Sequence, residues 1–187
     1  MSEIRSDEYW AEKGTEKSRV KLYLFRKRVS DKKGLPVLFL VHGSSFSART
    51  AYDLTIPGHE DYSLMDVFAA RGFDVWTMDH EGYGRSSQTD GFSYIADGVE
   101  DLKAAVPIVA RETGQDSFAF YGSSSGALRA AAFANACPDR VARLALAALV
   151  WTGEGSRTLA KRREKIEEWQ ATNRRIVDQA FYEGVFS

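Results

Sequence analysis

The stretch from Phe120 to Asn135, FYGSSSGALRAAAFAN, joins an apolar, aromatic segment to a run of strong helix formers through the turn GSSSG. This order of residues predicts a strand, a tight turn and a helix. Gly122, Ser124 and Gly126 fit the pattern G-x-S-x-G, in which the glycines let neighbouring backbones approach closely. The turn would lift Ser124 into solvent above a sheet. The pentapeptide alone also fits a Ser/Gly-rich surface turn.

The helix after this turn is expected to begin at Ser125, with its first N–H groups unpaired and pointing at the space beside Ser124. Such N–H groups bind an oxyanion, the charge that develops when a serine attacks an acyl group. The turn therefore points to acyl-transfer chemistry.

Other apolar runs along the chain predict strands buried on both faces, as in parallel sheets covered by helices. The predicted strands are Pro36 to Gly43, Phe73 to Asp79, Ser117 to Tyr121 and Arg143 to Trp151. The predicted helices are Ser63 to Arg71 with Ser63 as N-cap, Phe92 to Thr113 closed by Gly114, and Ser125 to Ala136. Alternating strands and helices predict an α/β fold with a doubly wound, mostly parallel sheet.

The two ends of the chain are less regular. Residues 1–19 are predicted to be a loose entry or a first edge strand, and Val20 to Arg28 an edge strand with one wet face. Residues 1–151 are assigned to the core domain and residues 152–187 to the start of a helical lid or cap. Apolar residues recur at helical spacing in this last segment: Ile166, Trp169, Ile176, Val177, Ala180 and Phe181. They predict an amphipathic helix, with Ser156 as N-cap, that packs on the domain, begins a lid over the site, or does both.

Composition sets limits on partners. The chain has 187 residues, 44% of them hydrophobic and 27% charged, with a net charge of -1, which fits one soluble globular domain and gives no sign of nucleic-acid or membrane binding. A single cysteine, Cys137, and the lack of an apolar leader or membrane-spanning run favour a cytoplasmic location. The sequence contains no H-E-x-x-H, no paired cysteines and no G-x-G-x-x-G at a helix start. It therefore holds no motif that implies a metal or an organic cofactor.

Three loops that follow predicted strands line up in order: His42-Gly43-Ser44-Ser45, Asp79-His80-Glu81-Gly82-Tyr83-Gly84-Arg85-Ser86, and Gly122-Ser123-Ser124-Ser125-Gly126. Together they resemble the α/β-hydrolase superfamily over about residues 20–151. The resemblance implies that Ser124 is the nucleophile and that the backbone N–H groups of Ser125 and Ser44 form the oxyanion hole, with Ser45 as the alternative to Ser44. It also implies that Asp79 and the glycines after it hold a tight loop.

The chain departs from the superfamily in its general base. In that superfamily an acid and then a histidine follow the serine, but no histidine follows Ser124. The resemblance gives His42 a role in shaping the backbone, His59 is expected to face solvent, and His80 is the one candidate for a substitute base. The superfamily continues with two further strand–helix units that carry the acid and the histidine. We therefore expect a C-terminally incomplete fold, with the missing portion as a candidate partner and an exposed apolar edge at the last strand.

Two functions from different classes follow. The first is a serine hydrolase that cleaves a small carboxylic ester, lactone or amide through an acyl-enzyme on Ser124 and is inactive as this chain because the acid and histidine are missing. Carbon–carbon bond hydrolysis and cofactor-free haloperoxidase chemistry remain open, because both use a serine at this place. The second is a non-catalytic α/β-hydrolase-like module that binds a small ligand or a protein partner. A third reading is that the 187 residues have no function alone.

Overall fold

A computed structural model of the protein describes residues 3–16, 18–29, 34–59, 61–149, 152–173 and 178–186. The chain divides into two compact units. The first comprises Met1–Thr89 and Ser93–Val150, and the second comprises Asp90–Phe92 and Trp151–Ser187. Each unit is described by itself below.

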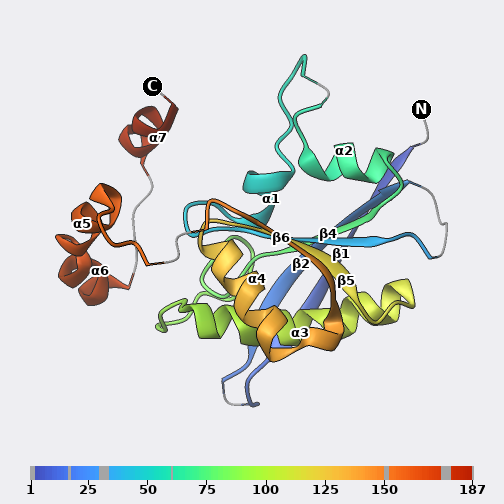
Figure 1. Ribbon diagram of the computed structural model, residues 1–187, viewed down its shortest axis with the longest axis horizontal. Coiled ribbons are helices and arrows are strands. Elements are labelled where there is room, and N and C mark those ends of the chain that lie inside the picture. Colours follow the sequence, from blue (N-terminus) through green and yellow to red (C-terminus); the bar gives the residue numbers. More distant parts are fainter. Residues whose placement is uncertain are drawn as a thin grey trace. The chain divides into compact units, whose positions relative to one another are not determined.

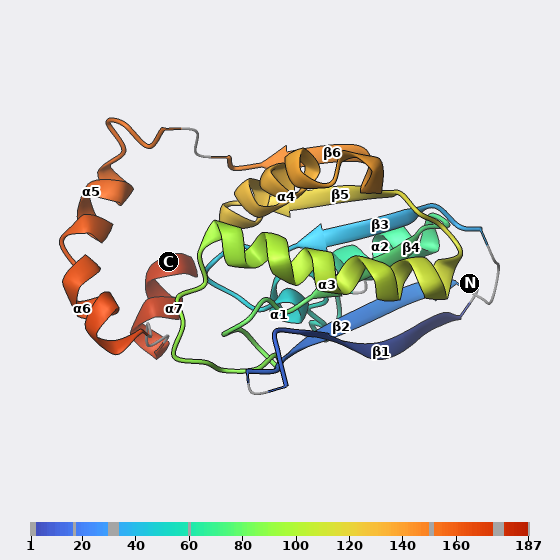
Figure 2. The ribbon, with the colours of Figure 1, turned by 90° about the horizontal axis from the view of Figure 1, so that it is seen from below.

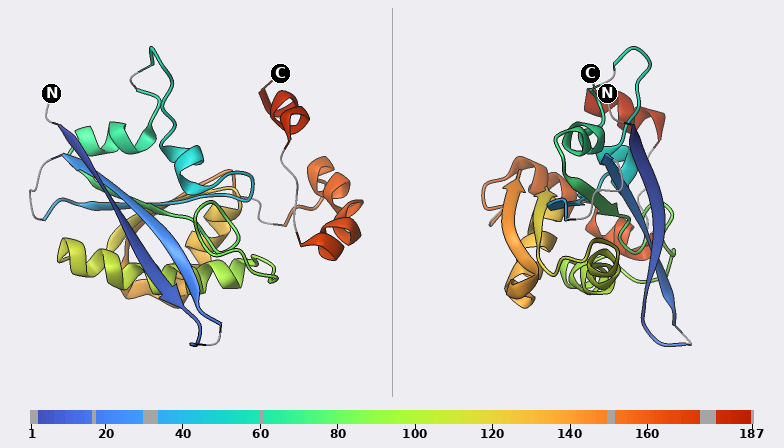
Figure 3. Two further views of the ribbon diagram at one scale, coloured as in Figure 1. Left: turned by 180° about the vertical axis from the view of Figure 1, so that it is seen from behind. Right: turned by 90° about the vertical axis from the view of Figure 1, so that its right-hand side faces the viewer.

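The described residues of the first unit form a six-stranded sheet in the order β1-β2-β4-β3-β5-β6. The strands are β1 (Ile4–Lys13), β2 (Val20–Val29), β3 (Val37–Val41), β4 (Asp74–Met78), β5 (Phe118–Ser123) and β6 (Val141–Ala147). Strands β4, β3, β5 and β6 run parallel, whereas β1 pairs with β2 and β2 with β4 in antiparallel fashion. The predicted mostly parallel α/β sheet is confirmed, and Figure 3 shows β1 and β6 at its opposite edges.

The prediction that Val20 to Arg28 forms an edge strand is wrong. The strand β2 has a neighbour on each side, because residues near the N-terminus form the outer strand β1. Two of the basic side chains that suggested a wet face are held by carboxylates instead, whereas Lys21 is exposed. Arg26 is 6% exposed, and its Nε donates a 2.8 Å hydrogen bond to Asp74 on β4. Lys27 pairs with Asp53 and Asp66 at 2.5 and 2.7 Å. Arg26, which is buried, and Lys27, which is half-buried, are tolerated here because each has a carboxylate partner.

Helices cover both faces of the sheet (Figures 1 and 2). On one face lie α1 (Ala48–Tyr52) and α2 (Leu64–Ala70), and on the other α3 (Ile95–Thr113) and α4 (Ser125–Ala136). Ser63 caps α2 as predicted, since its hydroxyl accepts a hydrogen bond from the N–H of Asp66. The predicted start of α3 at Phe92 is wrong, because Tyr94 is the N-cap and Asp97 accepts from the Tyr94 N–H. The α4 bounds are those predicted.

The apolar residues form one cluster on each face of the sheet. The cluster beneath α3 and α4 includes Phe39, Trp76, Leu102, Phe120 and Phe133. The cluster beneath α1 and α2 includes Tyr23, Phe25, Leu40, Met65 and Val75. Burial of apolar surface on both faces explains why the strand β3 is a continuous apolar run, and β4 is buried along its whole length although it contains Asp74 and Thr77.

The strand β6 lies at the edge of the sheet, and its only neighbour among the described strands is β5. Leu144 and Leu146 on this strand are 39% and 37% exposed, and Leu149 after it is 39% exposed. Edge strands of natural proteins usually avoid such an apolar row. The exposed apolar edge expected from the sequence is therefore present, while Trp151, at the end of the predicted strand, lies outside the described residues.

Among its described residues, the second unit contains three short helices, α5 (Arg157–Arg163), α6 (Ile166–Thr172) and α7 (Gln179–Phe186). The expectation of one amphipathic helix is wrong, because Asn173 ends α6 in the left-handed conformation, with φ 52°. Ser156 is the N-cap of α5 as predicted, since its hydroxyl accepts from the N–H of Leu159. Ile166 is 48% exposed, and Ile176 and Val177 of the predicted stripe lie outside the described residues. The lid remains a prediction.

Candidate active site

The turn between β5 and α4 holds Ser124 in a strained conformation, with φ 56° and ψ -124°. Few residues other than glycine adopt this region, and holding one there costs on the order of 1–3 kcal/mol. The turn is anchored by the N–H of Ser124, which donates a 3.0 Å hydrogen bond to the carbonyl of Ala147 at the end of β6. The Ser124 side chain is exposed. The sequence pattern thus gives the strained, solvent-facing serine that was expected.

Two glycines allow the turn to pack tightly. A Cβ added to Gly122 would lie 2.5 Å from the carbonyl oxygen of Gly126. A Cβ added to Gly126 would lie 2.2 Å from the carbonyl oxygen of Val41 and 2.6 Å from that of His42. These atoms are backbone and cannot swing away. The glycines therefore let the start of α4 approach both β5 and the end of β3.

The loop after β3 lies directly beside Ser124. A Cβ added to Gly43 would lie 3.2 Å from the Cβ of Ser124 and 3.7 Å from its Oγ. The next residue is Ser44, and Ser125 is the first residue of α4. The structure thus brings together the two backbone segments that carry the predicted oxyanion-hole residues, and the assignment of Ser44 and Ser125 remains a prediction. The Ser125 hydroxyl is buried, with no hydrogen-bond partner among the described residues.

Asp79 holds the loop after β4 in shape. One of its carboxylate oxygens accepts from the N–H of Ala48 at 2.7 Å and the other from the N–H of Arg85 at 2.9 Å. A Cβ added to Gly84, whose φ is +50°, would lie 2.1 Å from this carboxylate. Burial raises the pKa of Asp79 even though both hydrogen bonds favour the charged form. Asp79 therefore ties the loop to α1, and each of its carboxylate oxygens takes part in holding the loop.

None of the three histidines, all of them described, forms a hydrogen bond with Ser124. His42 is fully buried, and its two ring nitrogens contact the carbonyl of Gly43 at 2.6 Å and the N–H of His80 at 3.1 Å. His80 is also fully buried, with Nδ1 2.9 Å from Asp101 and no hydrogen-bond partner for Nε2 among the described residues. His59 is exposed, as expected. The candidate substitute base, His80, is therefore turned to Asp101 and not to Ser124.

The buried charged cluster around Asp101 was not predicted from the sequence. Asp101 lies on α3 and is fully buried, and Lys13 of β1 is 2.7 Å from its Oδ1. Lys13 also lies 2.7 Å from Glu81. Burial alone would raise the pKa of Asp101, but its hydrogen bond with His80 and the nearby Lys13 hold that pKa below its usual value. The sequence did hold one signal for this cluster. Asp101 is a carboxylate at a position that falls on the apolar stripe of α3, next to Leu102.

Acid is expected to destabilise the fold through its buried histidines. Burial lowers the pKa of His80 to about 4 and that of His42 well below 6.5, although the Asp101 hydrogen bond favours protonated His80. The unfolded chain therefore binds protons below about pH 6.5 that the folded chain does not, so stability is full above that pH and is lost as the pH falls. Urea unfolding should show a loss of ~2 kcal/mol from His80 between about pH 7 and pH 5, and a further loss in the same direction from His42.

The raised pKa of Asp79 acts in the opposite direction, because it favours the folded state as the pH falls. The exposed His59 supplies a control, since His59→Ala removes an imidazole that lies outside this buried pair. An unfolding free energy that is the same at both pH values would contradict the burial of neutral His42 and His80.

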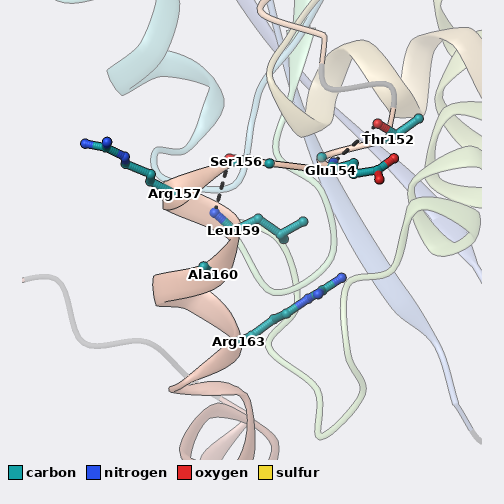
Figure 4. A pocket seen from close by; sticks show the side chains of 9 residues that line it. Thr152, Glu154, Ser156, Arg157, Leu159, Ala160 and Arg163 are labelled. Carbon is teal, nitrogen blue, oxygen red and sulfur yellow. Dashed lines mark hydrogen bonds between the residues drawn. The ribbon is translucent and has the colours of Figure 1, made fainter.

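The second unit has a hollow of its own, of about 420 Å³. Its lining comes from one stretch of chain, residues 152–157, with Leu159, Ala160 and Arg163 (Figure 4). The stretch is held by hydrogen bonds from the N–H of Leu159 to Ser156 and from the N–H of Glu154 to Thr152. None of the predicted site residues lines this hollow.

Among the described residues, no group of three or more His, Cys, Asp or Glu side chains is placed to hold a metal ion. Within the same residues, no helix combines the length and apolar character that crossing a bilayer requires.

Comparison with known proteins gives one family match. The model of the family Hydrolase_4, described as serine aminopeptidase, S33, matches residues 60–180, more than half of the chain. The lipase lipl-3 of Caenorhabditis elegans is 32% identical over 104 aligned residues, in an alignment that covers 50% of this chain and 24% of that lipase. The chain thus spans about a quarter of this curated relative.

Solved structures share the fold. A predicted CIB-like hydrolase from Thermoplasma acidophilum matches with a TM-score of 0.57 and 18% identity, over 82% of this chain and 67% of that one. An epoxide hydrolase from Vigna radiata matches with a TM-score of 0.58 and 16% identity, over 81% of this chain and 40% of that one. The 2-hydroxy-6-oxo-6-phenylhexa-2,4-dienoate hydrolase of Rhodococcus sp. strain RHA1 matches with a TM-score of 0.55 and 19% identity, over 77% and 46%. At these identities the likeness shows the fold alone.

Proposed function

The chain belongs to the Hydrolase_4 family of α/β hydrolases, and on that premise we propose that it carries the nucleophile of a serine hydrolase, Ser124. The substrate is a small carboxylic ester, lactone or amide, cleaved through an acyl-enzyme. One observation carries the proposal: Ser124 is exposed in a strained turn, φ 56°, with the backbone of Gly43 packed against it. Strain of this kind at an exposed serine has no use in a simple surface turn.

The reaction follows the usual course for a serine nucleophile. The Oγ of Ser124 attacks the carbonyl carbon while a general base takes the hydroxyl proton, and the carbonyl oxygen becomes an oxyanion that the N–H groups of Ser44 and Ser125 bind. The proton passes to the leaving group, which departs and leaves an ester on Ser124. Water then attacks this ester with the help of the same base and restores the free serine.

The general base and its acid are proposed to come from a portion outside the described chain. A serine hydroxyl is a poor nucleophile without a base, and the hydrogen bonds of His42 and His80 are directed elsewhere. The exposed leucines of the β6 edge support a partner portion that covers this edge. The chain alone is therefore proposed to be inactive, and the missing portion, in the same chain or as a separate fragment, is its proposed partner.

The names of the relatives do not agree on the kind of bond that is cleaved. The family is described as serine aminopeptidase, which points to an amide, whereas the curated relative is called a lipase, which points to an ester. Turnover of 4-nitrophenyl butyrate by the native protein, purified from its source, tests the proposal. Ester hydrolysis that the Ser124→Ala variant loses would support it, and a native protein without any turnover would count against it.

The second candidate function is a binding module of the same fold. The observation that favours it is the absence of a histidine contact to Ser124 within the described chain. A module of this kind would bind a small ligand or protein partner while its serine stayed inert toward covalent probes. The two functions therefore differ in the reactivity of Ser124.

A further inference from the structure

A chain of hydrogen bonds runs beneath the loop that carries Ser44. It begins at Asp101 on α3, whose Oδ2 lies 2.9 Å from Nδ1 of His80 and accepts a 3.1 Å hydrogen bond from the N–H of Glu81. Asp101 thus holds both the side chain of His80 and the backbone that follows it. Asp101, His80 and His42 are all fully buried, so water does not compete for these hydrogen bonds.

The next link fixes the tautomer of His42. The backbone N–H of His80 donates to Nε2 of His42 at 3.1 Å. A backbone N–H is a donor only, so Nε2 carries the lone pair and the proton of the neutral ring is on Nδ1. The Nδ1–H therefore donates to the carbonyl oxygen of Gly43, 2.6 Å away.

The last link reaches the predicted oxyanion hole through one peptide group. The carbonyl of Gly43 and the N–H of Ser44 belong to the same planar unit, in which the two groups point in opposite directions. A donor that holds the oxygen therefore sets the direction of the N–H. Gly43 itself lies against Ser124, because a Cβ on Gly43 would be 3.7 Å from Oγ of Ser124. Hydrogen bonding at the oxygen also polarises the peptide and strengthens its N–H as a donor.

We propose that Asp101 is a positioning residue for the oxyanion hole: acting through His80 and His42, it orients the Gly43–Ser44 peptide so that the N–H of Ser44 faces the reacting carbonyl. This inference rests on the proposed function of Ser124. Lys13 of β1, 2.7 Å from the other oxygen of Asp101, completes the arrangement. The inference assigns a role in the reaction to a buried helix residue that makes no contact with substrate.

The activity arm of the test uses the native protein and 4-nitrophenyl butyrate. Asp101→Asn is expected to lower kcat by about 10- to 100-fold with KM nearly unchanged, because a misplaced oxyanion donor weakens binding of the transition state more than that of the substrate. The control is Glu100→Gln, the adjacent position on the exposed face of α3, which loses only a surface pair with Lys103. A folded Asp101→Asn variant with the kcat of the wild type would overturn the inference.

A second pair of variants applies if Asp101→Asn does not fold. The side-chain amide of asparagine can place an N–H close to the position of the histidine Nδ1, so His42→Asn is expected to retain more of kcat than His42→Leu, which has no donor. Equal kcat values in the two folded variants would contradict the proposed relay.

A spectroscopic arm separates this inference from the proposed function. In nitrogen NMR of the native protein, His42 is expected to carry its proton on Nδ1, and the amide signal of Ser44 is expected to shift in His42→Asn and in Asp101→Asn. A proton on Nε2, or a Ser44 signal that neither substitution moves, would overturn the relay even in a protein that hydrolyses esters. If the native protein has no esterase activity, the proposed function fails, and the NMR result still decides whether Asp101 orients this peptide.

Discussion

Replacement of Ser124 with alanine is expected to abolish hydrolysis of 4-nitrophenyl butyrate by the native protein. Without Oγ no acyl-enzyme can form, and loss of the nucleophile in serine hydrolases costs at least about 10⁴-fold in turnover. The measurement is the steady-state rate above the uncatalysed background. The fold should survive, because the side chain is exposed and α4 keeps its packing.

Ser123→Ala is the matched control, since it removes a hydroxyl from the preceding position of the same turn, where no role in the reaction is proposed. It is expected to keep the wild-type rate within a few-fold. A Ser124→Ala variant that retains turnover would show that the hydrolysis occurs elsewhere in the protein.

Replacement of Gly126 with alanine is expected to cause a large loss of stability, although alanine is otherwise the better helix former by ~1 kcal/mol. The new Cβ would lie 2.2 Å and 2.6 Å from two carbonyl oxygens at the end of β3, neither of which can rotate away. The helix α4 would have to move off the sheet, so we expect the free energy of unfolding to fall by more than about 3 kcal/mol. Urea denaturation followed by circular dichroism measures this change.

Gly82→Ala separates steric overlap from backbone strain. Gly82 has a φ of +83° and nothing within 4 Å of the added Cβ, so only the conformational cost of a left-handed alanine applies, about 1–2 kcal/mol. If Gly126→Ala is no more destabilising than Gly82→Ala, the close approach of α4 to the end of β3 is not what the glycine provides.

Much of the fold could be predicted because its signals are local. The buried strands β3 and β4 and the bounds of α4 follow from residues that are neighbours in the sequence. The place of β2 could not be predicted, because it depends on pairing with β1 on one side and with β4 on the other, where Arg26 meets Asp74, 48 residues away. An isolated basic residue in a strand looks the same whether it faces water or a buried carboxylate.

The candidate site, like the fold, has one part that could be predicted from the sequence and one part that could not. Ser124 and its glycines are recognisable because the strained turn needs those residue types at fixed spacing. The cluster around Asp101 is not, because its members come from β1, from α3 and from the loop after β4, and only the folded sheet brings them together. The sequence places His42 and His80 in two of the three motif loops but does not show that both are buried and hydrogen-bonded away from Ser124.

The most direct test of the central claim is the mass of the native protein after exposure to a fluorophosphonate probe, with the labelled peptide then sequenced. These probes react with a serine only where a base activates it. Our account predicts one adduct, located on Ser124, in the protein that contains the missing portion, and none on the isolated 187-residue chain. A native protein that carries no adduct, or one on another serine, would contradict the assignment of Ser124 as the nucleophile.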